Sequence, residues 1–197
     1  MGLEESAFHL NSGWIALISG PMFSGKSADL INYLERASKY ARLEVQAFKP
    51  LLDKRYGQEK IISHSGSIYQ ALEVENTEGI IKNLKKSTQV IGISETQFLD
   101  DQIIDFCLEQ REKNKKLILE GLTTDYKKEP FRFKNSDKNM FDLLIHVEYH
   151  ILKTAFCDQC GKTAIYTVRN VKSDEQVLVG GKGAYSAACH LHYKLPE

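Results

Sequence analysis

Short apolar runs alternate along this chain with longer segments in which apolar side chains recur every three or four residues. The runs are typical of buried strands, and they lie at 14–18, 44–48, 89–93 and 116–119. The helical pattern occupies 26–42 and returns around 103–108, which predicts two helices. Strands that alternate with helices indicate an α/β fold with a parallel sheet flanked by helices.

A glycine-rich segment follows the first apolar run and leads directly into the first predicted helix. It matches the pattern G-x-x-x-x-G-K-[ST], in which backbone N–H groups surround a phosphate, the lysine adds a charge and the hydroxyl faces a magnesium ion. A glycine turn that matches by chance is the alternative, but the strand and helix on either side favour a P-loop. Its predicted ATP- and phosphate-binding residues are Gly20, Pro21, Met22, Phe23, Ser24, Gly25, Lys26 and Ser27.

The composition of the chain and the length of its strand-like runs change at about residue 151. Before this point, the segment 51–69 is polar and rich in glycine and serine, which predicts a long loop. After it, strand-like runs shorten to 164–168 and 176–179, and glycines cluster at 180–183. We therefore predict a P-loop nucleotide-binding domain at 1–150 and a small C-terminal module at 151–197. A module of this size needs a staple, that is, a cross-link such as a bound metal ion, to hold a core.

Two pairs of metal-ligating residues provide that staple. Cys157-x-x-Cys160 and Cys189-x-x-His192 are separated by 28 residues, and each pair can reach one ion from a tight turn. Four such ligands complete a tetrahedron and predict a structural zinc ion. A redox pair or unrelated buried thiols are the alternatives. Cys107 lies in the apolar stripe of its helix and is predicted to be a core residue.

Charge and composition narrow the class of partner. The chain carries 26 basic and 26 acidic residues, so no overall field attracts nucleic acid or a membrane surface. No apolar run approaches the roughly 20 residues that span a bilayer. The first residues are polar and acidic, which is unlike a signal peptide. We expect a cytoplasmic protein with a small-molecule partner and with neither nucleic acid nor a membrane among its partners.

Carboxylates near the expected ligand crevice are the catalytic candidates. In open α/β sheets this crevice lies outside the carboxyl ends of the strands. Glu95 follows the apolar run at 89–93 and would emerge there, where it could act as a general base. An ordinary exposed glutamate at a strand end is the alternative. Asp53 and Arg55, in the predicted loop, could support a metal-bound water and stabilise developing charge.

Several segments, in this order, resemble the type II thymidine kinases, the zinc-containing deoxynucleoside kinases of the cellular, poxviral and bacterial kind. They are GPMFSGKS, KPLLDKRY, SHSG, SETQF, EGLTTDYKKEPF, CDQCGKTAIYT and VGGKGAYSAACHLH. The resemblance runs from about Trp14 to Tyr193. It implies phosphorylation of the 5′-hydroxyl of thymidine or deoxyuridine by Mg²⁺-ATP in nucleotide salvage. It also implies a homotetramer that is inhibited by thymidine triphosphate.

The resemblance also implies roles for individual residues. Ser27 and Asp53 would support Mg²⁺, Glu95 would be the general base, and Arg55 would stabilise the transferred phosphoryl group. A loop of the zinc module, the lasso, would close the nucleoside pocket. The implied nucleoside-binding residues are Met22, Gln97, Phe98, Leu122, Tyr126, Phe131, Thr167, Leu178, Gly180 and Tyr185.

The chain departs from the family pattern at several positions. Ser94 stands where the family usually has the aspartate that supports the Mg²⁺ shell, and Thr123 stands where an aspartate follows Gly-Leu. Tyr126 replaces a common phenylalanine, and smaller departures occur at Ala28, Gln176 and Gly183. Ser94 motivates an alternative function, that of a catalytically weakened nucleotide-binding relative with a regulatory or assembly role.

Overall fold

A six-stranded sheet forms the centre of the protein in the computed structural model, which describes residues 5–8, 11–51, 59–172, 175–178 and 183–195. The strand order is β5-β2-β6-β7-β1-β8, and every neighbouring pair is parallel. The strands are β1 (Trp14–Ser19), β2 (Val45–Pro50), β5 (Leu72–Val74), β6 (Val90–Ile93), β7 (Lys116–Gly121) and β8 (Tyr149–Leu152). The parallel α/β sheet expected from the sequence is confirmed.

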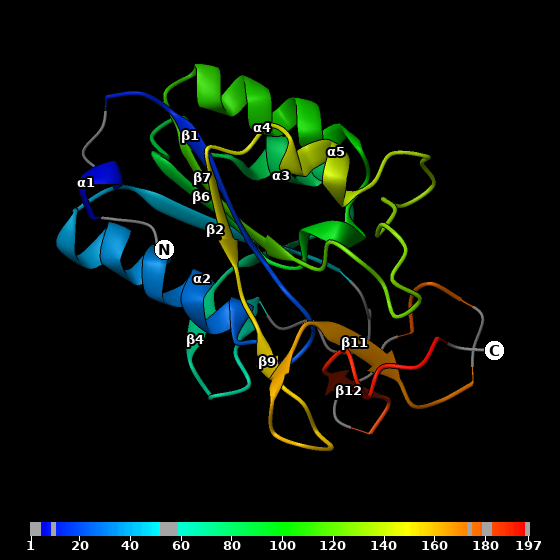
Figure 1. Ribbon diagram of the computed structural model, residues 1–197. Coiled ribbons are helices and arrows are strands. Elements are labelled where there is room, and N and C mark those ends of the chain that lie inside the picture. Colours follow the sequence, from blue (N-terminus) through cyan, green and yellow to red (C-terminus); the bar gives the residue numbers. More distant parts are fainter. Residues whose placement is uncertain (1–4, 9–10, 52–58, 173–174, 179–182, 196–197) are drawn as a thin grey trace.

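Helices cover both faces of this sheet (Figure 1). On one face lie α1 (Glu5–Phe8) and α2 (Lys26–Glu35), which continues as the π-helical turn η1 (Arg36–Tyr40). On the other face lie α3 (Thr77–Asn83), α4 (Gln102–Glu112) and α5 (Met140–Leu144). Strand β1 shows why both faces need cover, because Ile15 and Leu17 pack into one core cluster while Ala16 and Ile18 pack into the other.

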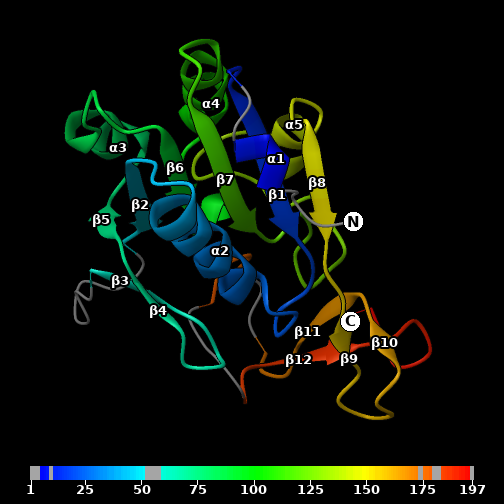
Figure 2. The same ribbon diagram turned by 90° about the vertical axis from the view of Figure 1, so that its left-hand side faces the viewer.

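Two short antiparallel sheets make up the C-terminal module (Figure 2). Strand β9 (Ala155–Phe156) pairs with β10 (Thr163–Ala164), and β11 (Tyr166–Arg169) pairs with β12 (Tyr185–Ala188). Strand β8 leads directly from the central sheet into β9, so the module lies beyond the carboxyl end of β8. The division of the chain at residue 150 stays a prediction, and β8 crosses that position.

The prediction of a strand at 176–179 is wrong for the described residues. Gln176, Val177 and Leu178 belong to no strand. The carbonyl groups of Gln176 and Leu178 accept hydrogen bonds from the side chains of Arg169 and Tyr185, which take the place of a partner strand. The side chains of this segment line the pocket described below, and this contact accounts for their apolar pattern without a strand.

The predicted loop at 51–69 contains more structure than expected. Residues 60–70 form a hairpin of β3 (Lys60–Ile62) and β4 (Ile68–Gln70), closed by a turn in which Ser67 N–H donates to Ser63 Oγ at 2.9 Å. Each strand has only three residues, too few for a periodic pattern to be recognised. Asp53 and Arg55 lie outside the described residues.

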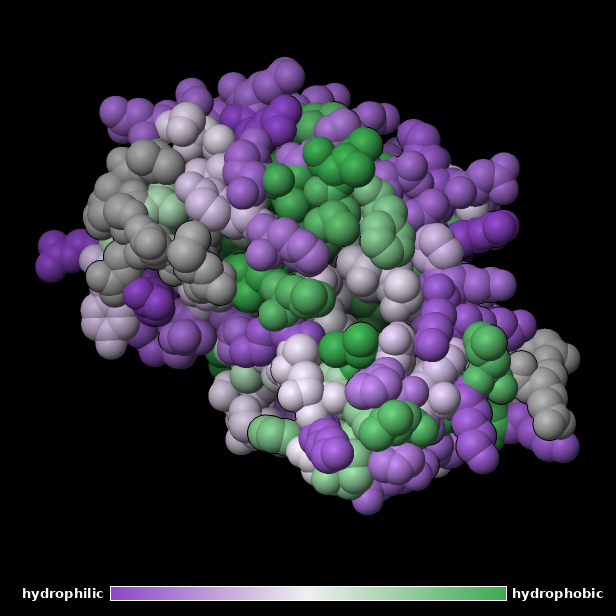
Figure 3. Space-filling model, in the orientation of Figure 1, coloured by the Kyte–Doolittle hydropathy of each residue, from purple (hydrophilic) through white to green (hydrophobic). Residues whose placement is uncertain are grey.

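The surface is mostly hydrophilic on the face shown in Figure 3. Apolar residues gather there over α5, where Phe141 and Ile145 are exposed. Within the described part of the chain, no helix combines the length and the apolar character needed to cross a membrane.

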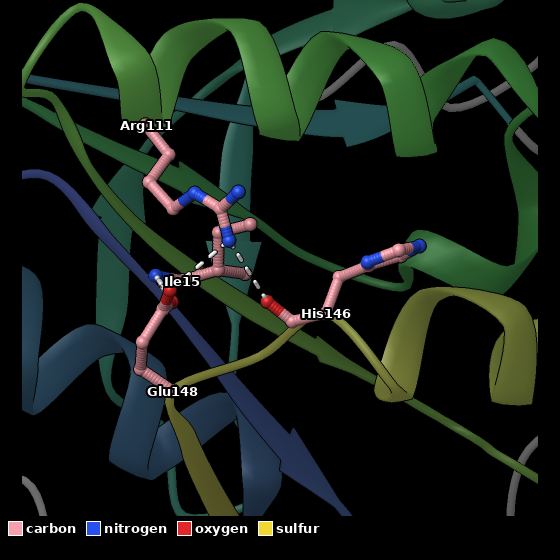
Figure 4. A network of polar contacts seen from close by, with 4 residues as sticks. All are labelled: Ile15, Arg111, His146 and Glu148. Atoms are coloured by element: carbon pink, nitrogen blue, oxygen red, sulfur yellow. Dashed lines mark hydrogen bonds and ion pairs between the residues drawn. The ribbon is translucent and has the colours of Figure 1, made fainter.

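A polar network fastens the amino end of the sheet to α4 (Figure 4). Arg111 Nη1 lies 3.0 Å from Glu148 Oε1 and donates to the carbonyl oxygen of His146 at 3.4 Å. Glu148 Oε2 accepts a hydrogen bond from Ile15 N–H at 2.7 Å. The network joins α4, β1 and the segment that enters β8, which leaves the opposite, carboxyl ends of the strands for a site.

Candidate active site

The glycine-rich segment has the strand–loop–helix context expected for a P-loop. Strand β1 ends at Ser19, and the chain turns through the loop into α2 at Lys26. Gly20 has a φ of +147°, and a Cβ there would lie 2.4 Å from the carbonyl oxygen of Lys153, so this turn requires glycine. Gly25 has a φ of +82° and is the N-cap of α2. The Lys26 ammonium donates to the carbonyl oxygen of Pro21 at 2.9 Å and is held close to the loop.

A cavity of about 440 Å³ opens beside this loop, between the carboxyl ends of the strands and the C-terminal module. The phosphate-loop residues Lys26 and Ser27 line it together with Glu95. Most of the predicted nucleoside-binding residues line the same cavity: Met22, Phe98, Leu122, Tyr126, Phe131, Thr167, Leu178 and Tyr185. Gly180 lies outside the described residues. The structure thus brings residues from distant parts of the chain to one cavity, and their individual roles stay predictions.

Glu95 is held in an unusual backbone conformation. Its φ of 49° is left-handed, which is uncommon for a residue with a side chain and is often found at functional sites. Gln97 Nε2 donates to Glu95 Oε2 at 2.6 Å, and Gln97 Oε1 accepts from Leu122 N–H at 3.1 Å. Gln97 is buried behind Glu95 and is not among the residues that line the cavity. Its contacts suit it to orient the Glu95 carboxylate.

Glu120 is a buried carboxylate that sequence reasoning missed. It lies near the carboxyl end of β7, and its Oε1 accepts hydrogen bonds from Ser94 Oγ at 2.6 Å, Ser27 Oγ at 3.2 Å and Glu95 N–H at 3.2 Å. Burial and the nearby Glu95 carboxylate raise the pKa of Glu120 to about 7, against the opposing effect of Lys26. Glu120 directly follows the apolar run at 116–119, just as Glu95 follows the run at 89–93. The position after a predicted strand, which singled out Glu95, could therefore have singled out Glu120 as well.

The oxygen atoms around Glu120 fit a magnesium ion. Mg²⁺ prefers hard oxygen ligands such as carboxylates, hydroxyls and water. Ser27 supplies the hydroxyl of the phosphate loop, and Glu120 Oε2 is a buried oxygen that has no hydrogen-bond partner among the described residues. When bound with ATP, the ion would neutralise charge on the phosphates. Asp53, the other predicted ligand, lies outside the described residues.

Arg169 holds the segment 175–178 over the cavity, and no spacing in the sequence pointed to it. Its guanidinium stacks on the Tyr126 ring at 3.7 Å. The same group donates to the Gln176 carbonyl oxygen at 2.9 Å and to the Tyr185 hydroxyl at 3.0 Å, and it also contacts the Glu175 carbonyl oxygen. The Tyr185 hydroxyl donates in turn to the Leu178 carbonyl oxygen at 2.9 Å. Arg169 therefore links this part of the lasso to the wall of the pocket.

The predicted zinc ligands converge in the C-terminal module. The ligand atoms of Cys157, Cys160, Cys189 and His192 all lie within 4.8 Å of one another. The Cys160 and Cys189 sulfurs are 3.8 Å apart, and His192 Nδ1 is 3.4 Å from the Cys189 sulfur. Tetrahedral Zn–S bonds of about 2.3 Å place two sulfurs about 3.8 Å apart, so the cluster could hold zinc.

The remaining thiol has a different setting from those of the cluster. Cys107 is fully buried in α4, and burial raises the pKa of its thiol, which confirms it as a core residue. Backbone hydrogen bonding from Cys189 instead lowers the pKa of the Cys157 thiol to about 6. Zinc binds the thiolate form, so this environment suits a ligand.

Comparisons with known proteins identify the family of this chain. A family model described as thymidine kinase matches residues 13–193. A thymidine kinase of Bdellovibrio bacteriovorus is 35% identical over 195 residues, which cover 99% of this chain and 92% of that protein. The X-ray structure of the Legionella pneumophila ATPase DotB superposes with a TM-score of 0.44 at 14% identity, over 80% of this chain and 45% of that one. That structural likeness is too distant to bear on function. The match over nearly the whole length of the chain shows that it belongs to the thymidine kinase family.

Proposed function

We propose that this protein transfers the γ-phosphoryl group of ATP to the 5′-hydroxyl of thymidine or deoxyuridine. One observation carries the proposal: Glu95, the phosphate loop and the largely aromatic and apolar pocket residues line one cavity. Phosphoryl transfer depends on holding the two substrates in line and on stabilising charge, and a single cavity meets both needs. Family membership supplies the two substrates, ATP and thymidine.

The proposed roles follow from the position of each group. Lys26 and Ser27, at the start of α2, would hold the phosphates of Mg²⁺-ATP. Glu95 would accept the proton of the 5′-hydroxyl as the nucleophile attacks. Gln97 would fix the direction of that carboxylate through its 2.6 Å hydrogen bond. Arg55 keeps its proposed role in stabilising charge, which rests on the family resemblance.

The lasso and the zinc ion would complete the nucleoside pocket. Residues 176–178 and Tyr185 reach the cavity from the C-terminal module. A zinc ion bound by the Cys₃His cluster would hold β9, β10 and β12 together. Because four protein ligands leave no open position for chemistry, its role would be structural. The proposed metal is therefore a structural staple for the wall of the pocket.

Assembly, regulation and location are proposed from the family alone. They are a homotetramer, feedback inhibition by thymidine triphosphate and a cytoplasmic location. The exposed apolar residues Phe141, in α5, and Ile145, directly after it, would offer a surface for subunit contact. The alternative of a catalytically weakened relative depended on Ser94 alone, and the family match lends it no support.

A kinase assay tests the proposal. Purified protein is incubated with Mg²⁺-ATP and thymidine, deoxyuridine or deoxycytidine, and the nucleoside monophosphate is measured. We expect turnover with the first two and a loss of kcat of at least about 100-fold in Glu95→Gln, because a general base contributes that much or more. Glu78→Gln, at an exposed glutamate of α3, is the matched control and should retain full activity. Absence of turnover with thymidine, or an active Glu95→Gln, would reject the proposal.

A further inference from the structure

Glu120 is buried between the phosphate loop and Glu95 and contacts both, although it does not line the cavity itself. Strand β7 lies between β6, which ends just before Ser94, and β1, which leads into the loop. Glu120 is paired in register with Ile18 of β1, and its side chain is 0% exposed. A carboxylate in such a place is costly to bury unless its oxygens are satisfied. Its presence on a central strand therefore calls for an explanation.

Hydrogen bonds satisfy only one of the two carboxylate oxygens of Glu120. Oε1 accepts from the hydroxyls of Ser27 and Ser94 and from the backbone N–H of Glu95. Oε2 is equally buried and has no hydrogen-bond partner among the residues that the structure describes. The carboxylate group as a whole lies next to the Ser27 hydroxyl of the phosphate loop, and a cation held there would compensate its buried charge.

Ser94 and Glu120 are complementary in hydrogen bonding, because the hydroxyl donates and the carboxylate accepts. In the type II thymidine kinases that this chain resembles, position 94 usually holds an aspartate that supports the magnesium shell. An aspartate here would face Glu120 Oε1, which lies only 2.6 Å from Ser94 Oγ, and two carboxylates at that distance repel each other. The serine hydroxyl instead donates a hydrogen bond to Glu120. Beside Glu95 the site thus keeps a second carboxylate, but it comes from the neighbouring strand.

We propose that Glu120 supplies the carboxylate that supports the Mg²⁺ of bound ATP, in place of an aspartate at position 94. It would act as a positioning residue. By accepting the Ser27 proton in a hydrogen bond, it leaves lone pairs of the Ser27 oxygen for the ion, and its negative charge attracts the ion. This inference rests on the proposed function only in taking Mg²⁺-ATP as the bound nucleotide.

Binding of Mn²⁺ to the ATP-bound protein tests the assignment without a nucleoside and without turnover. Free Mn²⁺ is measured by electron paramagnetic resonance while the ion is titrated into the protein with ATP. We expect Glu120→Gln to bind Mn²⁺ at least about tenfold more weakly, as for other residues that support metal ligands. Moving the charge to position 94, directly after β6, in the double variant Ser94→Asp with Glu120→Gln, should recover most of the lost affinity.

Two controls separate metal support from a merely structural role. Glu148→Gln makes the same chemical change in the polar network at the opposite end of the sheet and should leave Mn²⁺ affinity unchanged. Affinity for ATP in EDTA should be equal in the parent and in Glu120→Gln, because the lost charge acts through the ion.

The proposal is overturned if Glu120→Gln binds Mn²⁺ as the parent does, or if ATP binding is lost equally in EDTA. It is also overturned if the charge-swapped double variant recovers nothing. None of these results depends on thymidine, so a failure of the proposed kinase activity would appear separately, in the turnover assay of the parent protein.

Discussion

Replacing Gly121 with alanine tests whether Gln97 holds Glu95 in its working orientation. Gly121 ends β7, and a Cβ at this position would lie 2.4 Å from Gln97 Oε1. Gln97 is 1% exposed and is bonded at both ends of its amide, to Leu122 N–H and to Glu95 Oε2. The amide can make room for the new methyl group only by giving up one or both of these bonds.

The size of the effect follows from those two contacts. Leaving the buried Leu122 N–H unpaired costs about 1–3 kcal/mol, and losing a hydrogen bond to a carboxylate costs about 1.5–3 kcal/mol. We therefore expect the free energy of unfolding to fall by about 1–3 kcal/mol if one of these bonds is lost and by about 2.5–6 kcal/mol if both are lost. Displacement of a catalytic group by about 1 Å can reduce a rate about 100-fold, so kcat should fall by at least about tenfold.

Gly92→Ala is the matched control for this prediction. Its Cβ would lie 2.6 Å from Leu34 Cδ1, in the core between β6 and α2, so it should also cost about 1–3 kcal/mol through overpacking. It touches neither Gln97 nor the Glu95 carboxylate. The assay compares kcat and KM for thymidine at saturating Mg²⁺-ATP, with thermal unfolding of the same samples.

The reasoning is refuted if Gly121→Ala keeps its kcat, or if the two variants lose kcat to the same degree. In the first case Gln97 does not control Glu95. In the second case the loss reflects general destabilisation. A lower kcat in Gly121→Ala alone, with KM for thymidine unchanged, is the result expected of a misplaced base.

Three further predictions concern the lasso, the metal and pH. A lysine at position 169 cannot both stack on Tyr126 and donate to the lasso carbonyls. In Arg169→Lys, KM for thymidine should therefore rise about tenfold while the affinity for ATP is unchanged. Equal losses for both substrates would contradict this prediction. Metal analysis should find about one zinc ion per chain; Cys160→Ser should lose it and melt at a lower temperature, whereas Cys107→Ala should retain it. Desolvation lowers the pKa of His150, so the folded state binds its proton less readily than the unfolded state, whose value is about 6.5. The contribution of His150 to stability should therefore decline as the pH falls through this value. The melting temperature of the parent, relative to that of His150→Gln, should fall in the same direction; a difference that does not change with pH would reject that reasoning.

The sequence predicted most reliably the features that are local in the chain. The phosphate loop occupies consecutive residues between a strand and a helix, and the predicted zinc ligands form two close pairs. The strands β1, β6 and β7 are buried on both faces, so they appear as continuous apolar runs. Strand β8 lies at the edge of the sheet, where of its residues only Ile151 is buried, and its weak pattern was not recognised as a strand.

The sequence by itself determined the fold class, the phosphate loop, the family and the candidate base Glu95, because each depends on residues that are neighbours or that repeat a known order. Only the tertiary structure decided which carboxylate accompanies Ser27. Glu120 meets Ser94 and Ser27 across 26 and 93 positions of sequence, and strand order alone brings them together. The same holds for Arg169, whose contact with Tyr126 depends on how the lasso packs against the domain. Side chains that meet across strands leave no periodic trace in the chain, and their pairing is set by packing.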